Sequence, residues 1–304
     1  MKRIIMLCFV FLMLVGCSST TPASKESLSI LSPTGAPAIS LAHIASESQH
    51  NLVFVDGSDV LQAAFVNPEP EYDIIVAPTN LGVKLAQSGK SEYRLAAVVT
   101  WGNLYVVAKQ GTELSETVKF AAFGENAVPG LVFERIKNQL GVEEITYYNS
   151  VTEAQAALLS GHMDAALIAE PAATATIAKG KQNDLQLQIV SDLQALWQTE
   201  TGFEGYPQAS IFVRCTEGNK ALISDILTQV QNTLMLYSTD TESLKNDIET
   251  AGVETLGVPS ADLIVKSYER MGLKYRDAKE CENELRDFLF LFDIVYDPSI
   301  AGQE

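Results

Sequence analysis

The sequence predicts an α/β protein of two lobes, and three observations support this prediction. Strand-like and helix-like segments alternate from residue 28 to about residue 213. The expected strands are continuous apolar runs, such as Tyr72–Ala77 with the letters YDIIVA, and runs of this kind are typical of sheets that helices cover on both faces. The same order of elements occurs twice along the chain, which indicates two lobes of similar layout.

The first unit begins with an apolar strand that leads into the loop SPTGAP and then into a helix. Apolar residues at helical spacing, Ile39, Leu41 and Ile44, identify that helix. The remaining elements follow from similar runs. Strands are expected at Leu28–Leu31, Leu52–Val55, Tyr72–Ala77, Tyr93–Thr100 and Leu104–Ala108, and helices at Ala36–Ser48, Asp59–Val66 and Leu81–Gln87.

The second unit repeats this order. Gly141 ends one helix, and Ser150 with Glu153 has the spacing of a capping box at the start of the next. Its third strand, MDAALIA, ends in Glu-Pro, much as YDIIVA ends in Pro in the first unit. Strands are expected at Val118–Phe123, Ile145–Tyr148 and Met163–Ala169, and helices at Leu131–Leu140, Val151–Ser160 and Glu170–Gly180.

From Gln208 the chain becomes mainly helical. One strand, QASIFVR, precedes helical patterns at Asn219–Tyr237, Glu242–Ala251, Ser260–Gly272 and Glu280–Leu291. We expect this tail to pack back onto the first lobe. In open α/β sheets ligands bind beyond the carboxyl ends of the strands, so the loops after the strands of both units are the place to look for a site.

The first residues have the features of a secretory signal. Lys2 and Arg3 precede an apolar run, Ile4–Val15, that is shorter than the ~20 residues of a membrane-spanning helix. Leu14–Cys17 resembles the lipobox of bacterial lipoproteins, in which the Cys carries the lipid; the alternative is a plain signal peptide with an incidental Cys. We therefore expect a signal peptide at 1–16 and a Ser/Thr-rich tether at 17–27.

The charge of the chain excludes some partners. The formal net charge is −17, with 38 acidic and 21 basic residues. This balance argues against nucleic acid, which selects clustered Lys and Arg, and against electrostatic attachment to anionic lipid. The lipid on Cys17 would then be the membrane anchor. The three His residues are scattered along the chain and suggest no metal site, and no cofactor is expected. Cys215 and Cys281 form either one disulfide or two separate thiols.

These features together resemble one family. The chain resembles the substrate-binding lipoproteins of ABC importers with the type II periplasmic binding protein fold. The resemblance rests on the lipobox and on the segments SPTGAPAISLA, YDIIVAPTN, AAVVTWGNLYVVAK, DAALIAEPAA and GYPQASIFV. More narrowly they resemble the NMT1/THI5-like group, which includes binders of sulfonates, nitrate and thiamine precursors. The resemblance implies two lobes joined by two crossover strands, with a ligand cleft between them. It places lobe 1 at 28–106 plus 208–304 and lobe 2 at 107–207.

The same resemblance implies a function and partners. We expect an extracytoplasmic, membrane-anchored monomer that captures a small molecule and delivers it to an ABC permease and ATPase. Two alternatives are an enzyme of the same fold acting on a pyrimidine or cofactor precursor, and a ligand-sensing lipoprotein without a transporter. The sequence has no GxSxG, P-loop or HExxH motif, and we expect no enzymatic activity.

Candidate ligand residues lie where the expected strands end. Helix starts carry unpaired N–H groups with partial positive charge, and Gly35 permits close approach to the main chain, so the SPTGAP loop is a candidate for holding an anionic or polar group. The alternative is that Pro and Gly only shape the turn. The candidates are Thr34, Gly35, Ala36, Thr79, Asn80, Trp101, Asn103, Asn126, Val128, Glu170 and Gln208.

Several of these candidates have a structural alternative. Thr79 and Asn80 are also ordinary helix-capping residues. Trp101 suits a flat apolar ligand but equally a protein core. Glu170 is a candidate for contact with ligand, hinge or the other lobe. No Arg stands at a recognisable cleft position, and this lowers the case for a carboxylate clamp.

Overall fold

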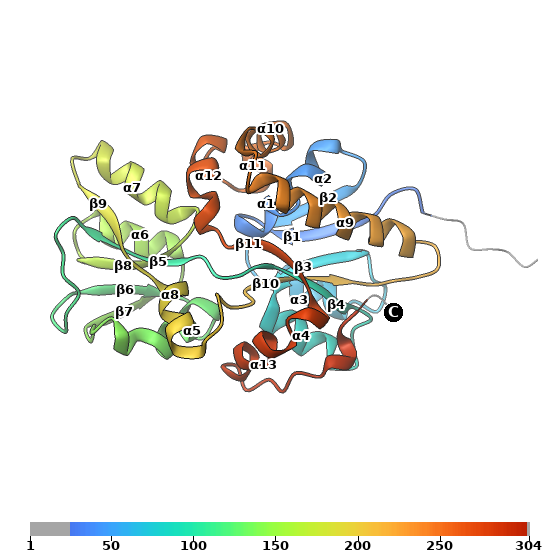
Figure 1. Cartoon of the computed structure of the whole chain (residues 1–304), viewed down its shortest axis with the longest axis horizontal. Helices are drawn as coiled ribbons and strands as arrows, with labels where there is room; N and C mark the ends of the chain where they lie inside the picture. The colour runs from blue at the N-terminus through green and yellow to red at the C-terminus, as the bar shows by residue number, and fades with distance from the viewer. Residues whose placement is uncertain (1–24, 303–304) are drawn as a thin grey trace, which may run out of the picture.

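The computed structural model describes residues 25–302 of the chain. These residues form two α/β lobes, each built around one sheet (Figure 1). The predicted fold class is therefore confirmed. The predicted signal peptide and Cys17 lie outside the described residues. Within the described part no helix is long and apolar enough to cross a membrane.

The sheet of the first lobe has six strands. β1 lies between β2 and β3 and is parallel to both, whereas β10 is antiparallel to its neighbours β3 and β4. In spatial order the strands are β11 (Leu273–Asp277), β4 (Arg94–Thr100), β10 (Ala209–Val213), β3 (Ile74–Pro78), β1 (Ser29–Pro33) and β2 (Asn51–Val55).

Helices cover both faces of this sheet (Figure 1). One face carries α1 (Ala36–Ile39), α2 (Ala42–Glu47), α9 (Lys220–Tyr237), α10 (Thr241–Ala251) and α12 (Ala261–Ser267). The other face carries α3 (Asp59–Val66), α4 (Thr79–Ala86) and α13 (Glu282–Phe290). The C-terminal helices α9 and α10 pack against α2, so the tail of the chain adds a layer to the first lobe.

The sheet of the second lobe has five strands. β6 is parallel to β7 and β8, and β5 is antiparallel to β8 and β9. Its faces are covered by α6 (Val151–Leu159) with α7 (Ala172–Gln182), and by α5 (Val128–Ile136) with α8 (Leu193–Thr201). In spatial order the strands are β7 (Ile145–Tyr148), β6 (Phe120–Phe123), β8 (Ala165–Ala169), β5 (Leu104–Lys109) and β9 (Leu187–Asp192).

Two strands, β9 and β11, are not predicted from the sequence. Both lie at the edge of their sheets, and β11 has the letters LKYRD, with three charged residues among five. Edge strands need no apolar run because one side is open to solvent, and charges there discourage pairing with another chain. The expected helix Ala36–Ser48 is also divided, into α1 and α2, at Ser40 and Leu41.

The chain crosses between the lobes at Trp101–Asn103, between β4 and β5, and returns between α8 and β10. The expected limit of lobe 1 at residue 106 falls within β5, a few residues after this change of sheet. The segment before β11 packs against the first crossover, since the Trp101 N–H donates to the Gly272 carbonyl at 2.8 Å. A Cβ at Gly272 would collide with the carbonyl oxygen of Gly102, so this close approach requires glycine.

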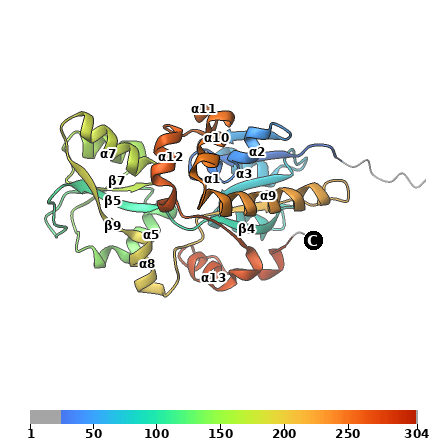
Figure 2. The ribbon, with the colours of Figure 1, turned by 45° about the horizontal axis from the view of Figure 1, so that its top comes forward.

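The short helix α12 belongs to the first lobe but also contacts α7 of the second. Figure 2 shows α12 between α7 and the remaining C-terminal helices. α11 (Val253–Leu256) and the loop after it lie beside the start of α1, where the Gly35 N–H donates to the Leu256 carbonyl at 3.0 Å. Thus the segment from α11 to β11 contacts both lobes.

A buried carboxylate anchors the start of the first lobe. Asp73 accepts hydrogen bonds from the Lys25 ammonium at 2.8 Å, the Ser29 N–H at 2.9 Å and the Asn219 amide at 2.8 Å. Burial by itself would raise the pKa of Asp73, but these donors outweigh it and the pKa is lowered. The carboxylate thus ties the entry of β1 to the start of α9. Cys215 and Cys281 are both free thiols, so the disulfide alternative is not realised.

Candidate functional site

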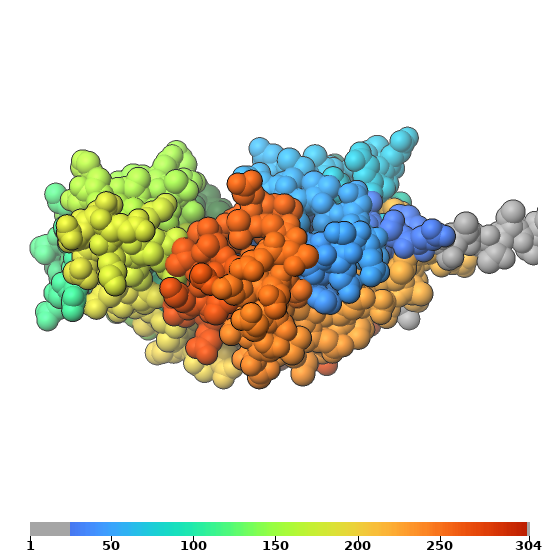
Figure 3. Space-filling model, turned by 90° about the horizontal axis from the view of Figure 1, so that it is seen from above, coloured from blue at the N-terminus to red at the C-terminus, as the bar shows by residue number. Residues whose placement is uncertain are grey.

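A cavity of about 400 Å³ lies between the two lobes. In Figure 3 the surface is hollowed between the green second lobe and the blue part of the first. The cavity lies at the carboxyl ends of β1 and β8, where ligands of open α/β sheets bind. Its wall contains Thr34, Gly35, Ala36, Pro37, Gly257 and Pro259 from the first lobe, Asn103 from the crossover, and Val151, Gln155, Ala169, Glu170, Pro171, Ala172, Ala175 and Lys179 from the second lobe.

The loop after β1 lines this cavity, but its donors are already used. The Thr34 N–H donates to the Val55 carbonyl at 3.1 Å, and the Gly35 N–H is bonded to Leu256. The Thr34 hydroxyl donates to the Asp56 carboxylate at 2.5 Å. Thr34 and Gly35 therefore form the wall as expected, but these groups are not free to hold an anion.

Asn103 is a buried polar residue of the cavity wall, with 3% of its surface exposed. Its Nδ2 donates to the Glu170 carbonyl at 2.8 Å, and the Glu170 N–H donates to the Asn103 carbonyl at 2.8 Å. Its Oδ1 is buried and has no hydrogen-bond partner. A buried oxygen without a partner is costly, and this one has almost no accessible surface, so it belongs to the interior of the protein and offers no contact to a ligand in this arrangement.

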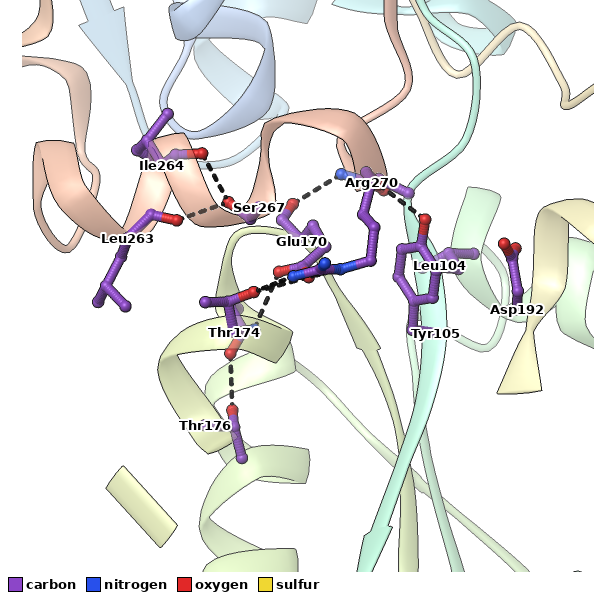
Figure 4. Close-up of polar contacts among 12 residues, drawn as sticks. Leu104, Tyr105, Glu170, Thr174, Thr176, Asp192, Leu263, Ile264, Ser267 and Arg270 are labelled. Atoms are coloured by element: carbon purple, nitrogen blue, oxygen red, sulfur yellow. Dashed lines mark hydrogen bonds and ion pairs between the residues drawn. The ribbon is translucent and has the colours of Figure 1, made fainter. Parts of the chain in front are cut away.

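Glu170 joins the second lobe to the first (Figure 4). Its fully buried carboxylate accepts from the Thr174 N–H at 2.9 Å and the Thr174 hydroxyl at 2.8 Å, and so caps α7. The same carboxylate accepts from Arg270 Nε at 2.8 Å, and Arg270 Nη2 donates to the Thr174 hydroxyl at 2.8 Å. The Glu170 oxygens are thus occupied by α7 and by a cation of the other lobe.

Arg270 is fixed at the main chain as well. It ends the turn that follows α12, and its carbonyl accepts from the Tyr105 hydroxyl at 2.9 Å (Figure 4). Tyr105 is part of β5 in the second lobe. Burial raises the pKa of Tyr105, so its hydroxyl stays protonated and remains a donor. Both the side chain and the backbone of Arg270 therefore link the lobes.

Thr79, Asn80 and Gln208 lie together beside the crossover but are not in the cavity wall. The Thr79 N–H donates to the Gln208 carbonyl at 3.1 Å, and the Gln208 N–H donates to the Thr100 carbonyl at 2.9 Å. The Thr79 hydroxyl is paired with that of Ser210 at 2.7 Å, which is a structural role. Asn80 Oδ1, Thr100 Oγ1 and Gln208 Oε1 are buried and have no partner, so this cluster resembles Asn103 in its unused acceptors.

Trp101 lines a different cavity, of about 950 Å³, whose wall also contains residues of both lobes but lies away from the carboxyl ends of β1 and β8. Its Nε1 donates to the Lys274 carbonyl at 2.9 Å, and the Arg276 guanidinium lies 4.8 Å from the ring centre. Arg276 is in turn paired with Glu284 at 2.6 Å. The indole is thus held by the first lobe and does not face the cavity that contains Thr34.

The expected second loop, ENAVPG, does not line the interlobe cavity. Asn126 is exposed in the turn before α5, and Val128 is buried in the core at the first position of that helix. The second lobe contributes α6 and α7 instead, through Val151, Gln155 and Ala175. The shared order of elements in the two units predicts Asn126 and Val128 at the site. The cavity instead lies on the side of the second sheet that α6 and α7 cover.

The wall and linking residues that were not predicted from the sequence include Gln155, Lys179, Gly257 and Arg270. Gln155 Nε2 donates to the Ala172 carbonyl at 3.0 Å and so connects α6 to α7. Arg270 stands 100 positions from Glu170 in the sequence, and nothing local to it signals the ion pair. Among residues 25–302 no group of three or more His, Cys, Asp or Glu side chains is placed to hold a metal ion.

No family model and no curated protein matches the sequence. Solved structures do match the fold. An ABC transporter protein from Parabacteroides distasonis has 22% identity and a TM-score of 0.73, covering 92% of this chain and 96% of its own. The periplasmic aliphatic sulphonate-binding protein SsuA of Escherichia coli has 17% identity and a TM-score of 0.63, with 89% and 87% covered.

A putative nitrate transport protein from Thermoplasma volcanium is similar at 10% identity and a TM-score of 0.51, with 88% of this chain and 95% of that chain covered. At such identities the likeness establishes the fold alone. The chain has the two-lobed fold of periplasmic substrate-binding proteins, and the resemblance predicted from the sequence is confirmed at the level of the fold.

Proposed function

We propose that this protein is a solute-binding lipoprotein that captures a small molecule in the interlobe cavity and delivers it to an ABC importer. The observation that carries the proposal is a cavity at the carboxyl ends of β1 and β8 whose wall comes from both lobes and from the crossover that joins them. A ligand in such a place contacts both lobes at once, so its binding favours the arrangement in which they are together. A permease that contacts both lobes would then recognise the loaded form.

The ion pair between Glu170 and Arg270 supports this proposal. It lies at the cavity wall and joins α7 of the second lobe to the segment after α12. Any separation of the lobes at this point must break the pair, and any ligand that brings the lobes together restores it. The pair therefore couples the state of the cavity to the relative position of the lobes.

The composition of the wall favours binding over catalysis. Its one carboxylate, Glu170, has both oxygens engaged, and its one amine, Lys179, is exposed. His43 lies on α2, where it is paired with Asp247 at 3.1 Å, and it is not part of the wall. An enzyme needs a positioned acid, base or nucleophile within reach of its substrate.

We place the protein on the extracytoplasmic face of the membrane, anchored by a lipid on Cys17, with a permease and an ATPase as partners. Metabolic labelling with a fatty acid tests the anchor: wild-type protein takes up the label, and Cys17→Ser does not. Label on the Cys17→Ser variant would contradict this assignment.

Thermal-shift screening of the purified protein against a library of small polar solutes tests the binding function. We expect one chemical class to raise the melting temperature, calorimetry to give a 1:1 complex, and mass spectrometry to recover the solute unchanged. Chemical turnover of that solute by the purified protein alone would overturn the proposal, and so would a library in which no solute binds.

A further inference from the structure

We infer that residues 270–274 form a third connection between the lobes, beside the two crossovers, and that this connection limits how far the lobes separate. The segment belongs to the first lobe by sequence, because it follows α12 and runs into β11, which pairs with β4. It is nevertheless bonded to the first crossover and to the second lobe. The inference goes beyond the proposed function and rests on it only in assuming that the lobes move when a solute binds.

The first argument is that the carbonyl groups of this segment follow the first crossover. The Gly272 carbonyl accepts from the Trp101 N–H at 2.8 Å, and the Lys274 carbonyl accepts from Trp101 Nε1 at 2.9 Å. Nearer the second lobe, the Arg270 carbonyl accepts from the Tyr105 hydroxyl at 2.9 Å. Every second carbonyl is bonded, as on one side of a strand. The contact between β11 and β4 therefore continues along the crossover, past the end of β4.

The second argument is that Arg270 attaches the segment to two elements of the second lobe. Its carbonyl is bonded to Tyr105 on β5, and its guanidinium donates to Glu170 and Thr174 at the start of α7, both at 2.8 Å (Figure 4). A single contact would leave the segment free to turn, whereas contacts with both β5 and α7 fix its direction. The segment is thus held by the second lobe although the chain assigns it to the first.

The third argument is that the connecting segments pack without room for a Cβ. A Cβ at Gly272 would collide with the Gly102 carbonyl oxygen, and a Cβ at Gly205, in the return crossover, would collide with the Trp101 carbonyl oxygen. Both glycines have a positive φ, 62° and 78°, which side chains rarely permit. The first crossover therefore lies between the return crossover and residues 270–274, as β4 lies between β10 and β11. Such close packing resists bending.

Hydrogen exchange of the indole N–H groups tests the contact with the crossover. The chain has two tryptophans, Trp101 and Trp197, so Trp197→Phe assigns their two signals in a nitrogen-15 spectrum. Gly272→Ala should speed the exchange of the Trp101 indole N–H by at least about 10-fold, because the added methyl group moves the Lys274 carbonyl away from it. The Trp197 indole should be unchanged. The matched control is Gly141→Ala, where φ is 64° but a Cβ meets nothing within 4 Å.

Small-angle X-ray scattering of the same variants tests whether the contact restrains the lobes. Gly272→Ala should raise the radius of gyration of the solute-free protein, because the lobes can then separate further, whereas Gly141→Ala should leave the radius unchanged. Trp101→Phe is a second variant for the case that Gly272→Ala does not fold. It removes the indole donor to Lys274 without adding atoms, and it should raise the radius in the same direction.

Two results would overturn the inference. An unchanged exchange rate of the Trp101 indole in Gly272→Ala would show that the segment is not fixed to the crossover. An unchanged radius of gyration, in Gly272→Ala or in Trp101→Phe if the first does not fold, would show that the contact does not restrain the lobes. Neither measurement involves a solute, so either failure leaves the solute-binding function to be decided by the thermal-shift screen.

Discussion

The two cavities beside the crossover differ in how their polar groups are paired. The cavity that contains Trp101 is the larger, about 950 Å³ against about 400 Å³. None of the described residues that line it has a buried side-chain polar atom without a partner. The interlobe cavity has one, Asn103 Oδ1. Volume therefore does not identify the site here; the smaller cavity is favoured because it lies at the carboxyl ends of β1 and β8.

The ion pairs of the two cavities also differ, because one lies within a single lobe and the other joins the two lobes. In the larger cavity Arg276 and Glu284 both belong to the C-terminal part of the first lobe, eight residues apart. In the interlobe cavity Glu170 and Arg270 come from different lobes. Only the second pair depends on whether the lobes are together, because its two partners belong to different lobes.

The largest effect is expected from filling the interlobe cavity, with the larger cavity filled as a control. Ala175 on α7 lines the interlobe cavity, and Ala195 on α8 lines the larger one. Ala175→Trp should weaken solute binding by at least about 100-fold, because the indole occupies the space of the ligand. Ala195→Trp should leave the affinity within about twofold, as calorimetry measures. Loss of binding in Ala195→Trp alone would reverse the assignment of the cavities.

The next effect is on stability, from removing one acid in each cavity. Glu170→Ala removes a fully buried carboxylate and leaves the Thr174 donors and the partly exposed Arg270 without their acceptor, and we expect a loss of about 2–4 kcal/mol in the free energy of unfolding. Glu284→Ala removes a carboxylate that is partly open to solvent, unlike that of Glu170, and should cost about 1 kcal/mol or less. Urea unfolding measures both, and equal losses would contradict the account.

A third prediction concerns acid pH and the first lobe, away from both cavities. The pKa of Asp73 is lowered in the folded protein, so its contribution to stability is present above the unfolded pKa and is lost as pH falls through the folded pKa. Asp73→Asn should lower stability at neutral pH by about 1–3 kcal/mol. It should also flatten the pH dependence below about pH 4, as unfolding at several pH values shows. An unchanged acid profile would contradict the assignment.

The smallest effect is expected for Arg270→Ala. The side chain is 38% exposed, so water replaces part of what is lost. We expect about 3- to 10-fold weaker solute binding, carried mainly by faster dissociation, because the link between the lobes is weakened. Stopped-flow measurements give the two rates. Slower association with unchanged dissociation would show that Arg270 guides the solute instead of joining the lobes.

Much of the fold is predictable from the sequence because it depends on local patterns. Apolar runs such as YDIIVA identify the central strands, and the spacing of Ser150 and Glu153 identifies the start of α6, where the Ser150 hydroxyl accepts from the Glu153 N–H at 3.2 Å. The edge strands β9 and β11 lack such patterns because half of their surface faces solvent.

The site is less predictable because it depends on which face of each sheet meets the other lobe. Thr34, Gly35, Ala36, Asn103 and Glu170 are in the cavity wall as the sequence suggested. Trp101, Asn126 and Val128 are not, since the order of elements fixes the ends of the strands but not the side on which the cavity forms. Arg270 could not be assigned, because its partner is set by the packing of α12 on α7.

The central claim is that the solute binds in the interlobe cavity at the carboxyl ends of β1 and β8. A crystal structure of the complex with the tightest-binding solute of the thermal-shift screen tests it most directly. We expect ligand density in the interlobe cavity, in contact with residues of both lobes. Density beside Trp101 in the larger cavity, or on a surface away from both cavities, would contradict the claim.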